Sequence, residues 1–137
     1  LMLFCPSGSH FTQGSAATWA QLADQPLITI TRDSGIRLLV DVGFETAQIE
    51  MKPAYEVTQI TTALALVTAG LGVAVLPTYA RAVSGDRIIA KPLVDPSISR
   101  DIVMIRPGGR SMSPALATFE TVVRRYAKRL LPEETGG

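Results

Sequence analysis

Hydrophobic and polar positions along this chain fall into short blocks that predict alternating strands and helices. Runs rich in apolar residues at 1–5 and 27–31 are typical of strands, and the unbroken apolar run at residues 73–76 is typical of a strand that is covered on both faces. Apolar residues recur at helical spacing within residues 58–69 and 113–130, which predicts an amphipathic helix in each segment. This order of elements favours an α/β architecture, in which helices pack on the faces of a sheet.

The clearest strand–helix–strand unit is the segment 55–79, with the sequence YEVTQITTALALVTAGLGVAVLPTY. A strand ends at Val57, Thr58 is placed to cap the helix that follows, and Gly70 supplies the stop of that helix. The second strand of the unit, residues 73–76, is apolar throughout, as expected of a buried parallel strand. Such units bring helix N-termini and the carboxyl ends of strands to one edge of a sheet, where open α/β folds collect small ligands.

A second strand-to-helix junction lies at residues 31–35, with the sequence TRDSG. Asp33 or Ser34 can cap the helix that begins here, and the pattern predicts that this helix ends at Gly43. A further strand is expected at residues 54–57. The chain thus offers two places where a helix N-terminus directly follows a strand.

The C-terminal part of the sequence predicts three more elements. Residues 88–94 form an extended, proline-interrupted segment expected at a sheet edge, and residues 102–105 form a compact apolar strand. Residues 1–5 and 102–105 flank most of the predicted elements, and a chain that leaves a compact part of a fold returns beside its exit. We therefore expect these two segments to pair antiparallel and to form a hinge. A long helix with an apolar stripe follows over residues 113–130, and residues 132–137 are expected to fray.

Composition narrows the class of protein without identifying it. The 137 residues suffice for one ordinary domain, and the evenly spread 47% of hydrophobic residues argues against a membrane protein. A net charge of +1 gives no indication of a nucleic-acid-binding surface. The single cysteine, Cys5, excludes an internal disulfide and a multi-cysteine zinc site, and it favours a reducing compartment, with the cytoplasm as the expected location.

The sequence contains no catalytic constellation. It has no Cys/His or His/Asp pair at a motif spacing, no G-x-S-x-G elbow and no phosphate loop, so we expect a protein that is not an enzyme and that carries no metal or cofactor. Residues 31–35 and 57–59 remain as candidates. Their backbone N–H groups, hydroxyls and one guanidinium suit an anionic or polar small molecule, although ordinary helix capping explains the same residues.

From residue 55 onward the sequence resembles the effector-binding domain of LysR-type transcriptional regulators. Four blocks in the family order carry the resemblance: VTQITTALALV, TAGLGVAVLP, KPLVDPSISRDIVMI and GRSMSPALATF. The N-terminal segment LMLFCPSGSHF also resembles the strand that joins the two lobes of that domain, with Phe11 where the family usually has a proline. The resemblance implies a type 2 periplasmic-binding-protein fold, with one Rossmann-like, three-layer αβα lobe and an incomplete first lobe.

The resemblance also implies how the chain is organised. Residues 1–106 correspond to the second lobe with its two crossing strands, and residues 107–137 correspond to the returning helix of the first lobe and a C-terminal tail. The helix-turn-helix that binds DNA belongs upstream of this segment. The implied function is to sense a small-molecule effector, such as a small organic acid, and to couple its binding to DNA binding by that upstream domain.

In this family the effector lies between the two lobes. The residues themselves leave two alternatives to the effector-sensing function. One is an extracytoplasmic solute receptor of the same fold, and the other is an enzyme of a similar bilobed fold, such as a prephenate dehydratase. The apolar stripe of residues 113–130 further predicts self-association, with a homodimer as the commonest closed form.

By resemblance, the effector-binding residues of this chain are Thr31, Arg32, Ser34, Val57, Thr58, Gln59 and Val103.

Overall fold

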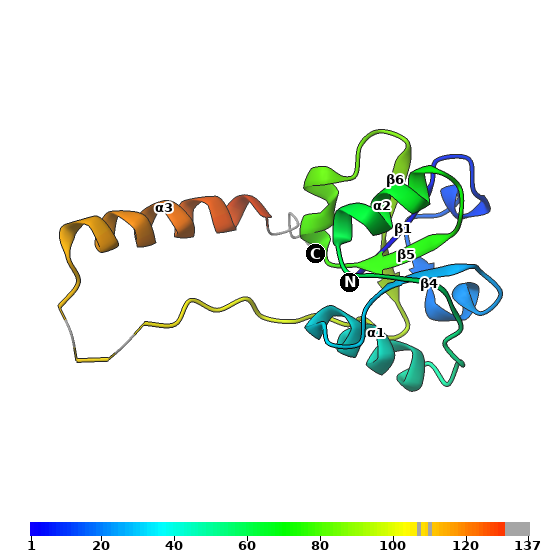
Figure 1. Cartoon of the computed structure of the whole chain (residues 1–137), viewed down its shortest axis with the longest axis horizontal. Helices are drawn as coiled ribbons and strands as arrows, with labels where there is room; N and C mark the ends of the chain where they lie inside the picture. Colours follow the sequence, from blue (N-terminus) through cyan, green and yellow to red (C-terminus); the bar gives the residue numbers. More distant parts are fainter. Residues whose placement is uncertain (107, 110, 131–137) are drawn as a thin grey trace. The chain divides into compact units, whose positions relative to one another are not determined.

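The computed structural model of the protein describes residues 1–106, 108–109 and 111–130 (Figure 1). The chain divides into two units, Leu1–Ser99 and Arg100–Gly137. The hydrophobic core that the described residues form lies in the first unit. The predicted fraying of residues 132–137 falls outside the described residues.

Six strands of the first unit form one sheet. They are β1 (Met2–Pro6), β2 (Ala17–Thr18), β3 (Leu27–Ile30), β4 (Pro53–Val57), β5 (Val73–Leu76) and β6 (Ile88–Val94). Their order in the sheet is β2-β6-β1-β5-β3-β4. Strand β1 is antiparallel to both of its neighbours and the remaining pairs are parallel, so β1 runs against the other five strands.

Helices cover both faces of this sheet. The α-helices of the first unit are α1 (Gly35–Thr46) and α2 (Ile60–Thr68), and three 3₁₀ helices accompany them: η1 (His10–Thr12), η2 (Trp19–Leu22) and η3 (Thr78–Val83). Figure 1 shows α1 and α2 on opposite sides of the sheet. Helix α2 joins β4 to β5, and both of these strands are parallel to β3, which lies between them. The predicted βαβ unit is therefore confirmed.

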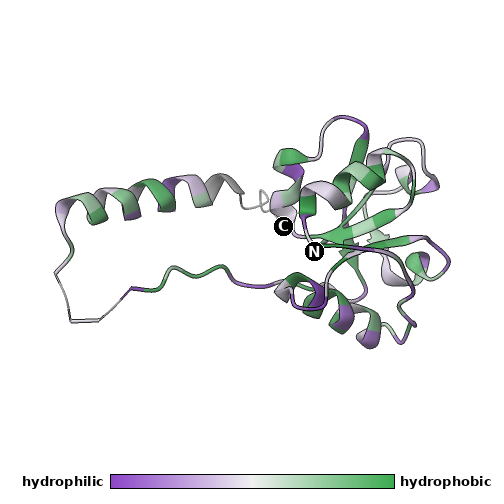
Figure 2. Cartoon of the chain, in the orientation of Figure 1, coloured by the Kyte–Doolittle hydropathy of each residue, from purple (hydrophilic) through white to green (hydrophobic). Residues whose placement is uncertain are grey.

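The core is centred on the inner strands and on one tryptophan. Strand β5 is buried at every position, as its unbroken apolar sequence predicts, and β3 is buried throughout as well, including its polar residue Thr29. Figure 2 shows hydrophobic residues concentrated along the strands of the sheet. Trp19 is 0% exposed, and its indole Nε1 donates a hydrogen bond to the carbonyl oxygen of Pro96 at 2.7 Å. The ring of Trp19 meets the ring of Phe44 edge-on, with centroids 5.2 Å apart.

The prediction that the first helix ends at Gly43 is wrong, because α1 continues to Thr46. Gly43 is buried in the helix interior, where it faces Trp19. A Cβ atom at this position would lie 2.6 Å from Cζ3 of the indole ring and closer still to Cη2 and Cζ2. Close packing of the helix against the indole ring, and not a change of chain direction, therefore requires glycine here.

The helix caps agree in part with the sequence. Ser34, one of two predicted candidates, caps α1, and its Oγ accepts a hydrogen bond from the backbone N–H of Ile36 at 3.2 Å. Thr58 was expected to cap α2, but the N-cap is Gln59, which makes no side-chain capping hydrogen bond. Gly70 follows the end of α2 with a φ of +76°, which confirms the predicted stop.

Two predictions for the C-terminal half are wrong. Strand β6 is not at the edge, because the two-residue strand β2 pairs with its outer side. Residues 102–105 form no strand, and their side chains are 45–87% exposed. Since β1 is paired with β5 on one side and β6 on the other, it has no free edge for the predicted antiparallel hinge partner.

The second unit contains α3 (Pro114–Leu130), which confirms the helix predicted for residues 113–130. Ser113 caps this helix, and its Oγ accepts a hydrogen bond from the N–H of Leu116 at 3.3 Å. Figure 2 shows hydrophobic and hydrophilic residues alternating along the helix. No helix in the described part of the chain combines the length and hydrophobicity needed to cross a membrane.

Candidate functional site

The two strand-to-helix junctions meet at one edge of the sheet. Strands β3 and β4 are parallel neighbours, and their last residues, Ile30 and Val57, are partners in the ladder. Beyond this pair, the backbone N–H of Thr31 donates a hydrogen bond to the carbonyl oxygen of Val57 at 3.0 Å. The helix N-termini that follow the two strands therefore lie at the same carboxyl edge of the sheet, as the sequence predicts.

The first junction is a tight turn between β3 and α1. The backbone N–H of Ser34 donates to the carbonyl oxygen of Thr31 at 3.0 Å, which closes the turn. Thr31 and Ser34 are half-buried, and Arg32 is exposed. The turn thus presents a hydroxyl and a guanidinium beside the positive end of α1.

The second junction lies between β4 and α2. Val57 is half-buried, whereas Thr58 and Gln59 are exposed. Because the side chain of Gln59 does not cap α2, the first backbone N–H groups of this helix receive no hydrogen bond acceptor from the N-cap. A carboxylate placed here would meet unsatisfied donors and the positive end of the helix dipole.

The structure thus places six of the seven predicted site residues at one edge of the sheet, and their assignment as effector-binding residues stays a prediction. Val103 belongs to the second unit and is 70% exposed, and its assignment stays a prediction. Among the described residues, no group of three or more His, Cys, Asp and Glu residues could hold a metal ion. Cys5 is buried in β1, where its Sγ lies 3.6 Å from the carbonyl oxygen of Ile89, so it has the environment of a packing residue.

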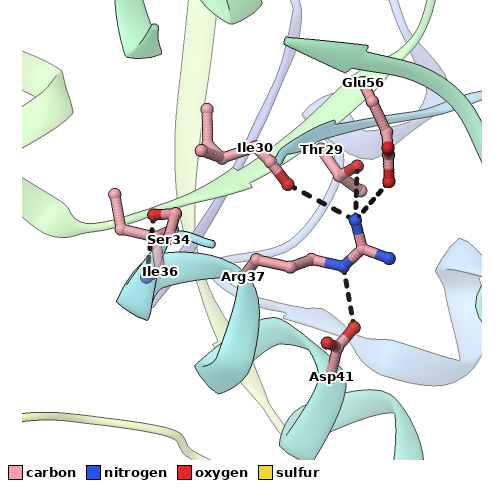
Figure 3. Close-up of polar contacts among 7 residues, drawn as sticks. All are labelled: Thr29, Ile30, Ser34, Ile36, Arg37, Asp41 and Glu56. Atoms are coloured by element: carbon pink, nitrogen blue, oxygen red, sulfur yellow. Dashed lines mark hydrogen bonds and ion pairs between the residues drawn. The ribbon is translucent and has the colours of Figure 1, made fainter. Parts of the chain in front are cut away.

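A polar cluster that the sequence pattern does not predict lies directly behind these junctions (Figure 3). Arg37 of α1 is 2% exposed and points beneath the ends of β3 and β4. Its Nε donates to Oδ1 of Asp41 at 2.8 Å, and its Nη1 donates to Oε2 of Glu56 at 2.6 Å. The same Nη1 also donates to Oγ1 of Thr29 at 3.3 Å and to the carbonyl oxygen of Ile30 at 3.4 Å.

The carboxylates keep this buried guanidinium charged. Burial acts to lower the pKa of Arg37, but the hydrogen bonds and charges of Glu56 and Asp41 outweigh burial and raise the pKa above its ordinary value. Part of this cluster has a local signal in the sequence, because Arg37 and Asp41 are spaced i, i+4 between apolar residues of the inward face of the helix. The contact with Glu56 has no such signal, because it joins different elements.

The class of protein follows from the fold. The chain is an α/β domain with the type 2 periplasmic-binding-protein fold, as the comparison with solved structures shows. A solved structure of the BenM effector binding domain with its effector benzoate is similar to 98% of this chain, which covers 62% of that domain, with a TM-score of 0.68 at 19% identity. The effector binding domain of QuiR in complex with shikimate matches 93% of this chain, and 61% of that domain is covered, with a TM-score of 0.64 at 19% identity.

The family follows from the sequence comparison. A family model described as the LysR substrate binding domain matches residues 1–128, so the chain belongs to this family. The uncharacterized HTH-type transcriptional regulator YbhD of Escherichia coli (strain K12) is 32% identical over 119 residues, which are 86% of this chain. The chain spans 38% of the length of that regulator.

Proposed function

We propose that this chain is the effector-sensing part of a LysR-type transcriptional regulator. Its effector binds at the edge of the sheet where the two strand-to-helix junctions, residues 31–35 and 57–59, lie side by side; we call this the junction edge. The observation that carries the proposal is the hydrogen bond between Thr31 and Val57, which holds two strand-to-helix junctions side by side. Membership of the LysR substrate-binding domain family supports it. The solved domains of BenM and QuiR, with benzoate and shikimate, support a small carboxylic acid as the class of effector.

Each candidate residue has a physical role in this proposal. The exposed guanidinium of Arg32 provides charge for an anion, and Thr58 provides a hydroxyl at the uncapped N-terminus of α2. Thr31, Ser34 and Gln59 supply further polar atoms around the same position, and Val57 supplies an apolar contact.

The proposed organisation is that of one part of a longer regulator. Residues 1–106 form the second lobe, residues 107–137 belong to the first lobe, and DNA binding resides in a helix-turn-helix elsewhere in the protein. This chain spans 38% of the length of YbhD, which supports its being part of a longer protein. The relatives are transcriptional regulators, which supports binding without catalysis over an enzyme or a solute receptor. The cytoplasm is the location that we propose for such a regulator.

Replacing Thr58 by Val is expected to weaken binding of benzoate or shikimate to this chain roughly tenfold, because one hydrogen bond to a charged group is lost. Titration of each acid, followed through the backbone amide signals of Thr31, Ser34 and Thr58, measures the affinity. Thr46→Val is the matched control, since Thr46 is exposed at the opposite end of α1. In the intact regulator, Thr58→Val should lower the effector response and leave basal DNA binding unchanged.

The contrary result is equally specific. Equal affinities for the wild-type chain and Thr58→Val would remove that residue from the site. Amide shifts confined to other parts of the sheet would reject the junction edge as the binding position.

A further inference from the structure

Arg37 joins three elements through one side chain. It starts on α1, and its Nη1 donates hydrogen bonds to Ile30 and Thr29 on β3 and to Glu56 on β4 (Figure 3). Thr29 and Glu56 are also direct partners in the parallel ladder. One guanidinium nitrogen, Nη1, is therefore hydrogen-bonded to both β3 and β4 near their carboxyl ends.

The contacts of this side chain lie one residue before the two junctions of the proposed site. Ile30 immediately precedes Thr31, and Glu56 immediately precedes Val57. Arg37 is also in the first turn of α1, which is capped by Ser34. The position of the guanidinium thus bears on the spacing of both junctions and on the start of the helix.

Burying an arginine only to fill this space would be less favourable in free energy than burying an apolar side chain. Its side chain is 3% exposed, but the carboxylates of Asp41 and Glu56 are 45% and 41% exposed, so water screens much of their attraction. An apolar side chain of similar size would avoid the desolvation of a buried charge. What an apolar side chain lacks is the planar guanidinium, whose donors fix the directions of the acceptors around it.

We propose that Arg37 is a positioning residue that holds the two junctions at the spacing required for effector binding. Its bonds to Glu56 and to the carbonyl oxygen of Ile30 act across the elements, whereas its bond to Asp41 lies within α1. The inference rests on the proposed function. It adds a group behind the site, without contact to the effector, on which the affinity of the site depends.

The test compares Glu56→Gln with Asp41→Asn. Each variant removes one charge from a half-exposed carboxylate that contacts the same guanidinium, but only the first weakens a bond between elements. Amide hydrogen exchange measures the opening of the Thr31 N–H, which is bonded to Val57, against the amides of β1 and β5 as a reference for global opening. In Glu56→Gln, exchange at Thr31 should rise about tenfold relative to that reference. In Asp41→Asn the ratio should stay as in the wild type.

The binding measurement separates the two proposals. Benzoate and shikimate affinities should fall about tenfold in Glu56→Gln and less than about twofold in Asp41→Asn, measured by amide titration of the same chains. If Glu56→Gln and Asp41→Asn raised amide exchange equally, and raised it at Thr31 no more than in the central strands, the positioning role would be overturned. Arg37 would then be a general stabiliser of the fold. A selective effect at Thr31, with neither acid bound by the wild type, would support the positioning of the junctions and reject the proposed function.

Discussion

Replacing Gly43 by Ala should lower the free energy of unfolding by about 2 kcal/mol, because overpacking this severe costs about 3 kcal/mol and the gain in helix propensity offsets only about 1 kcal/mol. The added methyl group would overlap three atoms of the Trp19 ring. This ring has little freedom to move, since it is fully buried, its Nε1 donates a hydrogen bond to the carbonyl oxygen of Pro96, and it makes a T-shaped contact with the ring of Phe44. Steric conflict should therefore dominate.

Chemical denaturation of three variants decides this prediction. Gly8→Ala is the control for the added methyl group, because no atom lies within 4 Å of the Cβ position at Gly8, and its stability should stay within about 0.5 kcal/mol of the wild type. Adding Trp19→Phe should make Gly43→Ala less costly, because the smaller ring leaves room for the methyl group. A Gly43→Ala chain at least as stable as the wild type would show that the indole ring is not confined.

Self-association of the 137-residue chain is the second large effect that we expect. The helix α3 exposes apolar side chains along its length, among them Leu116 at 49%, Phe119 at 62% and Tyr126 at 57%. Burying each large apolar side chain contributes about 1.5–3 kcal/mol, so this face gains strongly from a partner. We expect copies of the chain to associate through it, with a homodimer as the simplest closed form. In the longer regulator that we propose, the sheet of the first lobe is expected to cover this apolar face instead.

Sedimentation across a wide range of protein concentration measures the association. Phe119→Ser combined with Val123→Ser should convert the chain to a monomer. The hydrophobic core lies within residues 1–99 and contains neither residue, so the first unit should remain folded. Arg125→Ser is the control on the same helix, since Arg125 is exposed, and this variant should still associate. A wild-type chain that sediments as a monomer at every concentration would contradict the burial argument.

The parts of the fold that the sequence predicts well are those with local causes. Strand β5 is apolar at each of its positions and is fully buried between two neighbours, so its composition alone indicates its place in the sheet. The placement of the two junctions follows in the same way. Once β3 and β4 are recognised as parallel strands, their carboxyl ends and the following helix N-termini must share an edge.

The errors arise where a distant partner decides the outcome. Gly43 has the position of a helix stop, and only the contact with Trp19 shows that it serves close packing. Residues 102–105 have the composition of a strand, but β1, their expected partner, is already paired on both sides. Arg37 was missed for the same reason, because its bond to Glu56 depends on how two separate elements meet.

The central position of β1 has a consequence for how the protein is made. Leu3 pairs with Val75 on one side and with Lys91 on the other, so the strand synthesised earliest in this segment acquires its neighbours late. A nascent chain therefore carries an apolar strand with two open edges until residues 73–94 have left the ribosome. Pairings so distant in sequence form slowly, and open strand edges invite pairing with other chains. During translation, Met2–Pro6 is accordingly the segment of this sheet with the longest need of chaperone protection.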